Sequence, residues 1–259
     1  MAEQKVYPNF SVANNAKPNR FLNFPFLGVI VKVVILIPVF VELSFLSLAA
    51  FFVLFVNWFV VLFTGKYWDT AYSFFLSLMR FTGKIQLYIL GITDTYPGFA
   101  LNTNGLFELT IAKPEKPNRW FAVPFFGIFV RFILLIPYII FTNVLLRGSE
   151  VAMFFSWFTI LFKGNLPESL YEFEKDSLRV SFAGSSYLLG LSDTYPSFAI
   201  SMNHQTVKIL LIIAGTILVL SRMNGDYART YNRQSPNHRY YYQQNFSPRA
   251  GVPTDNKTY

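Results

Sequence analysis

The sequence predicts a mainly α-helical integral membrane protein: two tandem repeats, each a membrane helical hairpin with an interfacial amphipathic helix and short flanking β-strands, then a C-terminal membrane helix. Its composition is the first reason: hydrophobic residues make up 53% of the 259 residues and charged residues only 14%, against about 25% charged residues in a soluble domain. The second reason is a long apolar run that occurs twice, at 24–63 and 123–162. The third is a further apolar segment, 207–220, which a polar tail follows.

One block of sequence occurs twice with a constant offset. The motif Lys-Pro-Asn-Arg occupies 17–20 and 116–119, and Asp-Thr-Tyr-Pro occupies 94–97 and 193–196, so both ends of the block return after 99 residues. Because one offset fits both ends, we infer a duplication without later insertion. The predicted organisation is repeat one at 1–103, repeat two at 104–202, a C-terminal membrane helix at 206–222 and a disordered tail at 223–259.

The two apolar runs are expected to fold back on themselves. A straight helix of this length would be about 60 Å long, roughly twice the thickness of the hydrocarbon layer. The polar residues at 142–143 and 147–150 mark the expected turn in repeat two. A turn there leaves only 151–162 for the returning helix, which is too short to cross. The alternative to a crossing hairpin is therefore a shallow wedge in one leaflet.

Basic residues flank both ends of each apolar run. The positive-inside rule therefore places both flanks on the cytoplasmic side of a multi-pass cell-membrane protein, with a cytoplasmic N-terminus. The last membrane helix would then place the C-terminal tail outside, although the tail is basic. The side on which the tail lies stays open.

The segments 68–90 and 167–189 are expected to be amphipathic helices in the headgroup layer. In repeat one, polar residues recur every three or four positions, which is the spacing of one helix face. They are Asp69, Ser73, Ser77, Arg80 and Lys84. The alternative is a helix that packs on a small sheet.

Short strands are expected at both ends of each repeat. The predicted strands are 6–13 and 99–102 in repeat one, and 106–112 and 198–202 in repeat two. Asn104-Gly105 between two of them is typical of a β-hairpin.

Several motifs occur in a recognisable order. Repeat one reads Arg-Phe at 20–21, Ile-Pro at 37–38, Trp-Phe at 58–59 and Thr-Asp-Thr-Tyr-Pro-Gly-Phe at 93–99. This order resembles the bacterial membrane family catalogued as domain of unknown function 4389, over about 5–103 and 106–202. Neither repeat carries the whole Gly-Arg-Tyr-Pro signature of that family. The resemblance implies a membrane location and no established activity.

Lys32 and Arg131 are the sharpest candidate site residues, because each lies inside an apolar run. Charged residues at membrane depth are costly and commonly functional. The alternative is snorkelling, in which the long stem carries the charge back to lipid phosphate. The functional hypothesis is an interior contact with Asp94 and Asp193, or with a lipid headgroup.

The Asp-Thr-Tyr-Pro motifs supply a second set of candidates: Asp94, Tyr96, Asp193 and Tyr195. An aspartate accepts backbone N–H bonds in a turn, and proline favours the extended segment that follows. We expect a structural turn beside the membrane interface; the alternative is a small polar binding site.

The basic motifs supply the third set, which should bind anionic lipid headgroups: Lys17, Arg20, Lys116 and Arg119. The tail alternates arginine with tyrosine, a pattern that can bind single-stranded nucleic acid. We favour instead a solvated tail that recruits a protein, and we do not expect a nucleic-acid partner.

No catalytic or cofactor motif is present in the sequence. There are no cysteines, and His204 and His238 lie far apart without a carboxylate cluster, so no cofactor and no metal are expected. The leading hypothesis is a non-enzymatic membrane scaffold or accessory subunit that docks a protein complex or shapes the bilayer, as a homo-oligomer or with a protein partner. The alternative is a small transporter or channel with Lys32 and Arg131 lining a path.

Overall fold

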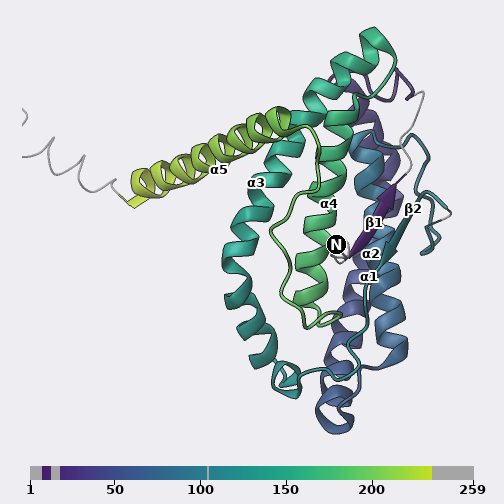
Figure 1. Cartoon of the computed structure of the whole chain (residues 1–259), viewed down its shortest axis with the longest axis vertical. Coiled ribbons are helices and arrows are strands. Elements are labelled where there is room, and N and C mark those ends of the chain that lie inside the picture. The colour runs from purple at the N-terminus through teal and green to yellow at the C-terminus, as the bar shows by residue number, and fades with distance from the viewer. Residues whose placement is uncertain (1–7, 13–17, 104, 235–259) are drawn as a thin grey trace, which may run out of the picture. The chain divides into compact units, whose positions relative to one another are not determined.

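The computed structural model describes residues 8–12, 18–103 and 105–234. The elements are β1 (Asn9–Val12), α1 (Leu27–Thr64), α2 (Asp69–Leu90), β2 (Phe107–Thr110), the 3-10 helix η1 (Arg119–Ala122), α3 (Phe126–Lys163), α4 (Glu168–Leu188) and α5 (Gln205–Gln234) (Figure 1). The chain divides into two compact units after Thr216. Both repeats and the first part of α5 belong to the first unit.

Each apolar run forms one continuous helix, so the predicted hairpins at 24–63 and 123–162 are wrong. α1 and α3 each have 38 residues, and Pro38 and Pro137 lie inside them. Three of the polar residues expected to form a turn bond along the helix instead, although the buried hydroxyls of Thr142 and Ser149 have no hydrogen-bond partner among the described residues. Asn143 Nδ2 donates to the carbonyl of Ile139 at 2.8 Å, and Arg147 pairs with Glu150. A polar cluster that can bond along its own helix does not require a turn.

A sharp bend precedes each long helix. Phe26 and Phe125 have φ angles of 62° and 61°, which non-glycine residues rarely adopt. A Cβ atom on Gly28 would lie 2.4 Å from the carbonyl oxygen of Leu22, and one on Gly127 would lie 2.0 Å from that of Phe121. Glycine is therefore required at both positions, and the bend folds the preceding segment back against the helix.

The two amphipathic helices form where the sequence predicts them, but the later part of each polar face is covered. Lys84 is fully buried and donates to the carbonyl of Pro97 at 2.7 Å. Arg179 is also buried and donates to the carbonyl of Ala199 at 2.9 Å. These side chains hold the extended segments that follow α2 and α4. The prediction of a polar stripe facing the headgroups is therefore wrong for Lys84 and Arg179, whereas Asp69 and Ser73 are exposed. The alternative is observed, because Arg80 of α2 donates to Leu109 of the small sheet at 3.0 Å.

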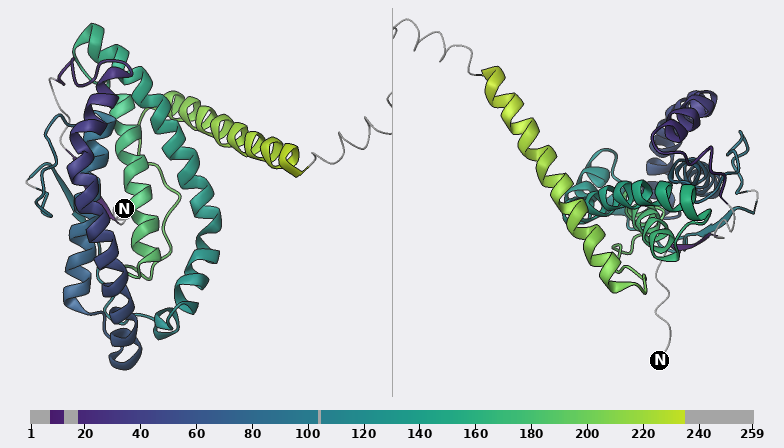
Figure 2. Two further views of the ribbon diagram at one scale, coloured as in Figure 1. Left: turned by 180° about the vertical axis from the view of Figure 1, so that it is seen from behind. Right: turned by 90° about the horizontal axis from the view of Figure 1, so that it is seen from above.

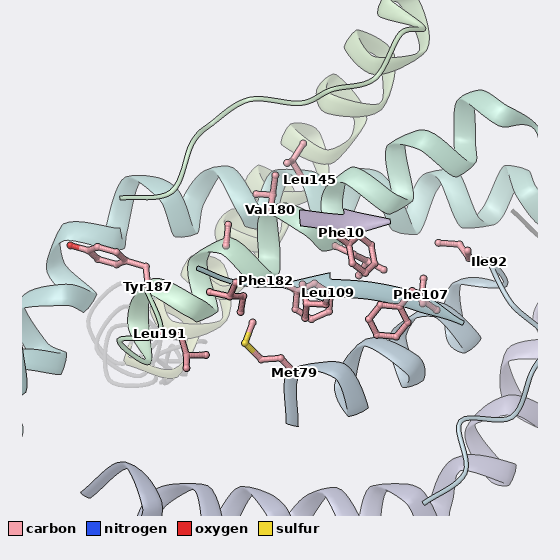
Figure 3. Close-up of a cluster of buried hydrophobic side chains, with 14 of the residues drawn as sticks. Phe10, Met79, Ile92, Phe107, Leu109, Leu145, Val180, Phe182, Tyr187 and Leu191 are labelled. Atoms are coloured by element: carbon pink, nitrogen blue, oxygen red, sulfur yellow. The ribbon is translucent and has the colours of Figure 1, made fainter. Parts of the chain in front are cut away.

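β1 pairs with β2 in antiparallel register, with Phe10 opposite Leu109. Phe10, Phe107 and Leu109 are buried and point toward α2 and α4 (Figure 3). The alternate residues of the strands point outward and are exposed: Asn9, Ser11, Glu108 and Thr110. Residues 99–102 and 198–202 form no strand, so the hairpin predicted around Gly105 is wrong. β2 instead pairs with the strand of the other repeat.

The two repeats are related by a pseudo-two-fold axis. Tyr72 donates to the carbonyl of Ile111, and Tyr171, 99 residues further on, donates to that of Val12. The long helices make a matching exchange of ring contacts, with centroids 5.5 and 5.6 Å apart. The two pairs are Phe26 with Trp157, and Phe125 with Trp58. The beginning of each long helix therefore lies beside the end of the other. α1 and α3 run in opposite directions (Figure 2).

The repeats build three layers. The sheet packs on α2 and α4, where Phe10 meets Phe182 of α4 with ring centroids 5.4 Å apart. α1 packs on α2, and α3 packs on α4. The layers are therefore the sheet, then α2 and α4, then the long helices α1 and α3.

α5 begins where the C-terminal membrane helix is predicted but continues past residue 222. The prediction of a disordered tail is therefore wrong for 223–234, and 235–259 lie outside the described residues. The first part of α5 crosses α3 at two glycines. A Cβ atom on Gly215 would lie 2.2 Å from the carbonyl oxygen of Val144, and one on Gly148 would lie 2.8 Å from that of Leu211. Small residues allow this close approach of helix backbones, as in membrane proteins.

Within residues 8–12, 18–103 and 105–234, three helices are long and apolar enough to cross a membrane: α1, α3 and the 205–225 part of α5. The long helices also expose large apolar side chains, with Phe63 and Phe162 each 76% exposed. Water does not solvate such a surface favourably. These features mark a membrane protein.

Candidate functional site

The charge inside α1 belongs to a first polar cluster, formed by Asn19, Asn23, Lys32 and Asp94. Lys32 is only 1% exposed, and its Nζ donates to Oδ1 of Asn23 at 2.8 Å. The amide of Asn23 donates in turn to Oδ1 of Asp94 at 3.0 Å and to the carbonyl of Asn19 at 2.9 Å. The backbone N–H of Asn19 donates to Oδ2 of Asp94. The cluster therefore joins the start of α1 to the Asp-Thr-Tyr-Pro segment.

The charge inside α3 belongs to a second polar cluster, formed by Asn118, Arg131 and Asp193. Arg131 is 4% exposed and pairs directly with Asp193. Its guanidinium also donates to the carbonyls of Tyr187 at 2.6 Å and Ser192 at 3.2 Å. The backbone N–H of Asn118 donates to Oδ2 of Asp193 at 3.0 Å. Snorkelling does not describe Lys32 or Arg131, because both side chains are buried within the protein.

Asn23 is the residue that sequence reasoning missed. Its counterpart 99 positions later is Ala122. The shorter lysine of repeat one reaches the aspartate through an asparagine, whereas the longer arginine of repeat two reaches it directly. The signal was present in the sequence as two linked differences between the repeats, Lys32 to Arg131 and Asn23 to Ala122.

Aromatic rings cover both cations. Nζ of Lys32 lies 5.4 Å from the ring centroid of Tyr88. The guanidinium of Arg131 lies 4.6 Å from the ring of Phe121 and 4.9 Å from that of Tyr187. Such contacts favour a cation that has lost its water. Burial raises the pKa of Tyr88 and of Tyr187, so both tyrosines stay neutral.

The tyrosines of the Asp-Thr-Tyr-Pro segments are exposed but anchored. Tyr195 donates to the carbonyl of Leu134 at 3.2 Å, and its ring contacts Tyr187 and Tyr138. Tyr96 places its ring 6.4 Å from that of Tyr88. These contacts tie the extended segments to the helices. A ligand-binding role for the two tyrosines stays a prediction.

The basic candidates are not members of the two polar clusters, although Arg20 follows Asn19 and Arg119 follows Asn118 in the chain. Lys17 lies outside the described residues, and Arg20, Lys116 and Arg119 are exposed. A Cβ atom on Gly164 would lie 2.9 Å from Nη2 of Arg20, and one on Gly65 would lie 2.6 Å from Nη2 of Arg119. Each arginine therefore lies on the glycine that ends the long helix of the other repeat. Headgroup binding by these residues stays a prediction.

A cavity of about 20 Å³ lies beside the second polar cluster. Asn57, Tyr67 and Ala122 are among the residues that line it, together with Arg131. A water molecule needs roughly 10–15 Å³ by this kind of measure, so the cavity has room for little more than one water.

Comparison with known protein families places both repeats in one group. The model of the family described as "Domain of unknown function (DUF4389)" matches residues 27–100 and 127–199. The chain belongs to the DUF4389 family. Each DUF4389 match begins at the long helix and ends after the Asp-Thr-Tyr-Pro segment. Each match contains the cation and the aspartate of the polar cluster of its own repeat. Asn23 and the strands lie outside both matches. No curated protein and no solved structure matches the chain.

Proposed function

We propose that this DUF4389 protein is a non-enzymatic membrane scaffold that shapes the bilayer in which its long helices are embedded. The observation that carries the proposal is the distribution of side chains on α1 and α3. Lys32 and Arg131 are turned into the repeats, whereas large apolar residues dominate the exposed surface of both helices.

The exposed surface of the long helices is extensive. α1 exposes phenylalanines along its second half and α3 exposes them near both ends: Phe45, Phe51, Phe52, Phe55, Phe59, Phe63, Phe126, Phe129, Phe132, Phe154, Phe155, Phe158 and Phe162. Each helix of 38 residues is about 57 Å long at roughly 1.5 Å per residue. Inserting such a surface displaces lipid over a broad area, which favours a change in bilayer shape.

The polar clusters have a structural role in this proposal. They tie each long helix to the Asp-Thr-Tyr-Pro segment and keep the layers rigid, as buried polar networks do. In the alternative function, transport, Lys32 and Arg131 would line a path for solute. Their enclosure by carboxylate, carbonyl and aromatic groups does not favour that role.

Reconstitution of the purified full chain into unilamellar vesicles of phosphatidylcholine and phosphatidylglycerol tests the proposal. We expect electron cryomicroscopy to show narrowed or tubular vesicles wherever protein is present, and round vesicles in protein-free controls. Round vesicles at high protein density would contradict bilayer shaping. A stable protein complex that co-purifies in mild detergent would then favour an accessory subunit, and solute flux would favour a transporter.

A further inference from the structure

We infer that the pseudo-two-fold axis of the repeats stands along the membrane normal, so that α1 and α3 lie within a single leaflet and the sheet faces water. This inference rests on the proposed membrane function and specifies the partner surface as one leaflet of an anionic bilayer. The "lipid face" denotes the exposed sides of α1 and α3. The "water face" denotes the outward side of the sheet, with Asn9, Ser11, Glu108 and Thr110.

Symmetry restricts how the molecule can enter a bilayer. Because α1 and α3 are antiparallel partners, the axis that relates them runs across the helices rather than along them. The axis passes through the sheet between Phe10 and Leu109, which are 99 residues apart and pair with each other. Two arrangements follow: the long helices stand upright with the axis in the plane of the membrane, or they lie flat with the axis along the normal.

The sheet argues against the upright arrangement. Upright helices would place the axis, and therefore the middle of the sheet, at the centre of the bilayer. The water face would then expose Glu108 and three uncharged polar side chains to hydrocarbon. In a sheet of two strands each strand is also an edge, and unpaired backbone groups are not tolerated in lipid. In the flat arrangement the same face lies on the water side.

The middle of α3 gives an independent argument. Arg147 and Glu150 form an ion pair there, and the side chain of Glu150 is 52% exposed. Upright helices would place this carboxylate near the centre of the bilayer as well, where a charged group is unfavourable. Helix length agrees, because about 57 Å is nearly twice the roughly 30 Å of hydrocarbon that an upright helix would cross.

Charge at the two ends of the molecule also favours the flat arrangement. Arg20 lies beside the end of α3 and near Lys163, whereas Arg119 lies beside the end of α1 and near Lys66. Upright helices would place these equivalent basic ends on opposite sides of the membrane, against the positive-inside rule. Flat helices place both ends in one headgroup layer, where anionic lipid attracts them.

The absence of cysteine from the sequence makes labelling straightforward. Thr64 and Lys163 are exposed, are 99 residues apart and mark the two ends of the long helices. Three single-cysteine variants of the full chain suffice: Thr64→Cys, Lys163→Cys and, on the water face, Ser11→Cys. Each is labelled with a membrane-impermeant maleimide in sealed right-side-out and inside-out membrane vesicles. We expect all three to react from the same side, and reaction of Thr64→Cys and Lys163→Cys from opposite sides would overturn the inference.

A depth measurement provides a second readout. Val34, Leu48 and Phe59 are exposed along α1, and a spin label at each reports depth through quenchers held at graded positions in the lipid. We expect all three labels in one leaflet; a depth that runs from one interface through the centre to the other would overturn the inference. Carbonate extraction separates the two proposals, because release of the wild-type chain from membranes would contradict the membrane function itself.

Discussion

Arg131 pairs with Asp193 without an intermediary, although 62 residues separate them in the chain. In repeat one the equivalent lysine, Lys32, reaches its aspartate only through Asn23. The two repeats therefore preserve one connection between the long helix and the Asp-Thr-Tyr-Pro segment while using side chains of different length.

Replacing Arg131 by leucine should destabilise the fold by about 2–4 kcal/mol. The change removes the ion pair and leaves the carbonyls of Tyr187 and Ser192 without this donor. Thermal unfolding in mild detergent, followed by tryptophan fluorescence, measures the loss. Arg147→Leu is the matched control on the same helix; its pair with Glu150 is more exposed and should contribute less than about 1 kcal/mol. Equal effects of the two variants would refute a special role for Arg131.

A double-mutant cycle tests the difference between the repeats. Asn23→Ala should cost about 1–3 kcal/mol, because Nζ of Lys32 loses the acceptor that Oδ1 of Asn23 provides. Lys32→Arg alone should also destabilise, because the longer side chain meets Asn23. The double variant reproduces the pair found in repeat two, Ala122 with Arg131, and should recover much of the lost stability. Unfolding curves of the wild type, the two single variants and the double variant give the four stabilities. If the two single losses of stability simply add in the double variant, residues 23 and 32 do not act as a pair.

Gly215→Ala should weaken the crossing of α5 over α3. A Cβ atom there would lie 2.2 Å from the carbonyl oxygen of Val144, and the helices must separate to admit it, at about 1–3 kcal/mol. The same change at Gly225, which meets nothing within 4 Å, should be neutral or stabilising through helix propensity. Hydrogen exchange in the first part of α5 reports the crossing directly. Unchanged protection in Gly215→Ala would contradict this close contact.

Glu174 should make stability depend on pH. Burial raises the pKa of this carboxyl well above its usual value of 4.5. The hydroxyl of Ser156 lies 2.9 Å from the carbonyl of Ala152 and 3.4 Å from Oε1 of Glu174, to which it donates. This contact lowers the pKa of Glu174, but burial outweighs it. The folded state therefore holds a proton that the unfolded chain releases near pH 4.5, and stability falls as the pH rises above that value.

Glu174→Gln should remove this dependence, because the amide keeps the shape of the carboxyl and cannot ionise. Unfolding in detergent between pH 5 and pH 8 should show that the stability of the variant depends less on pH than that of the wild type. Above the pKa of folded Glu174, the variant should be more stable than the wild type by about 1.4 kcal/mol for each unit by which folding raises that pKa. The exposed Glu168 begins the same helix, and Glu168→Gln should leave the profile unchanged. A profile that Glu174→Gln does not alter would mean that another group titrates.

Much of the local structure followed from the sequence. The offset of 99 residues predicted the two repeats, and apolar periodicity placed α2 and α4 within one residue of their observed ends. Membership of the DUF4389 family is likewise confirmed. These features depend on residues close together in the chain, so a repeated sequence pattern is enough to predict them.

The hairpins and the solvated polar stripes were wrong for one shared reason. Both predictions favoured membrane or water, rather than other parts of the protein, as the surroundings of a helix. Lys84 and Arg179 are instead surrounded by segments of the protein itself, and α1 stays continuous although it exceeds the bilayer thickness. Helix spacing identifies which residues share a face, but it does not identify what covers that face.

By itself the sequence determined that the chain is duplicated and unusually apolar, where its helical segments lie and which charges fall inside the long helices. Composition and periodicity report these features because they depend on residues close together in the chain. Only the tertiary structure decided that the repeats exchange contacts about a pseudo-two-fold axis, that β1 pairs with β2, and that Asn23 links Lys32 to Asp94. Those relationships join residues up to 159 positions apart, as between Val12 and Tyr171. They exist because burying one face of each repeat against the other satisfies polar groups that neither lipid nor a single repeat satisfies.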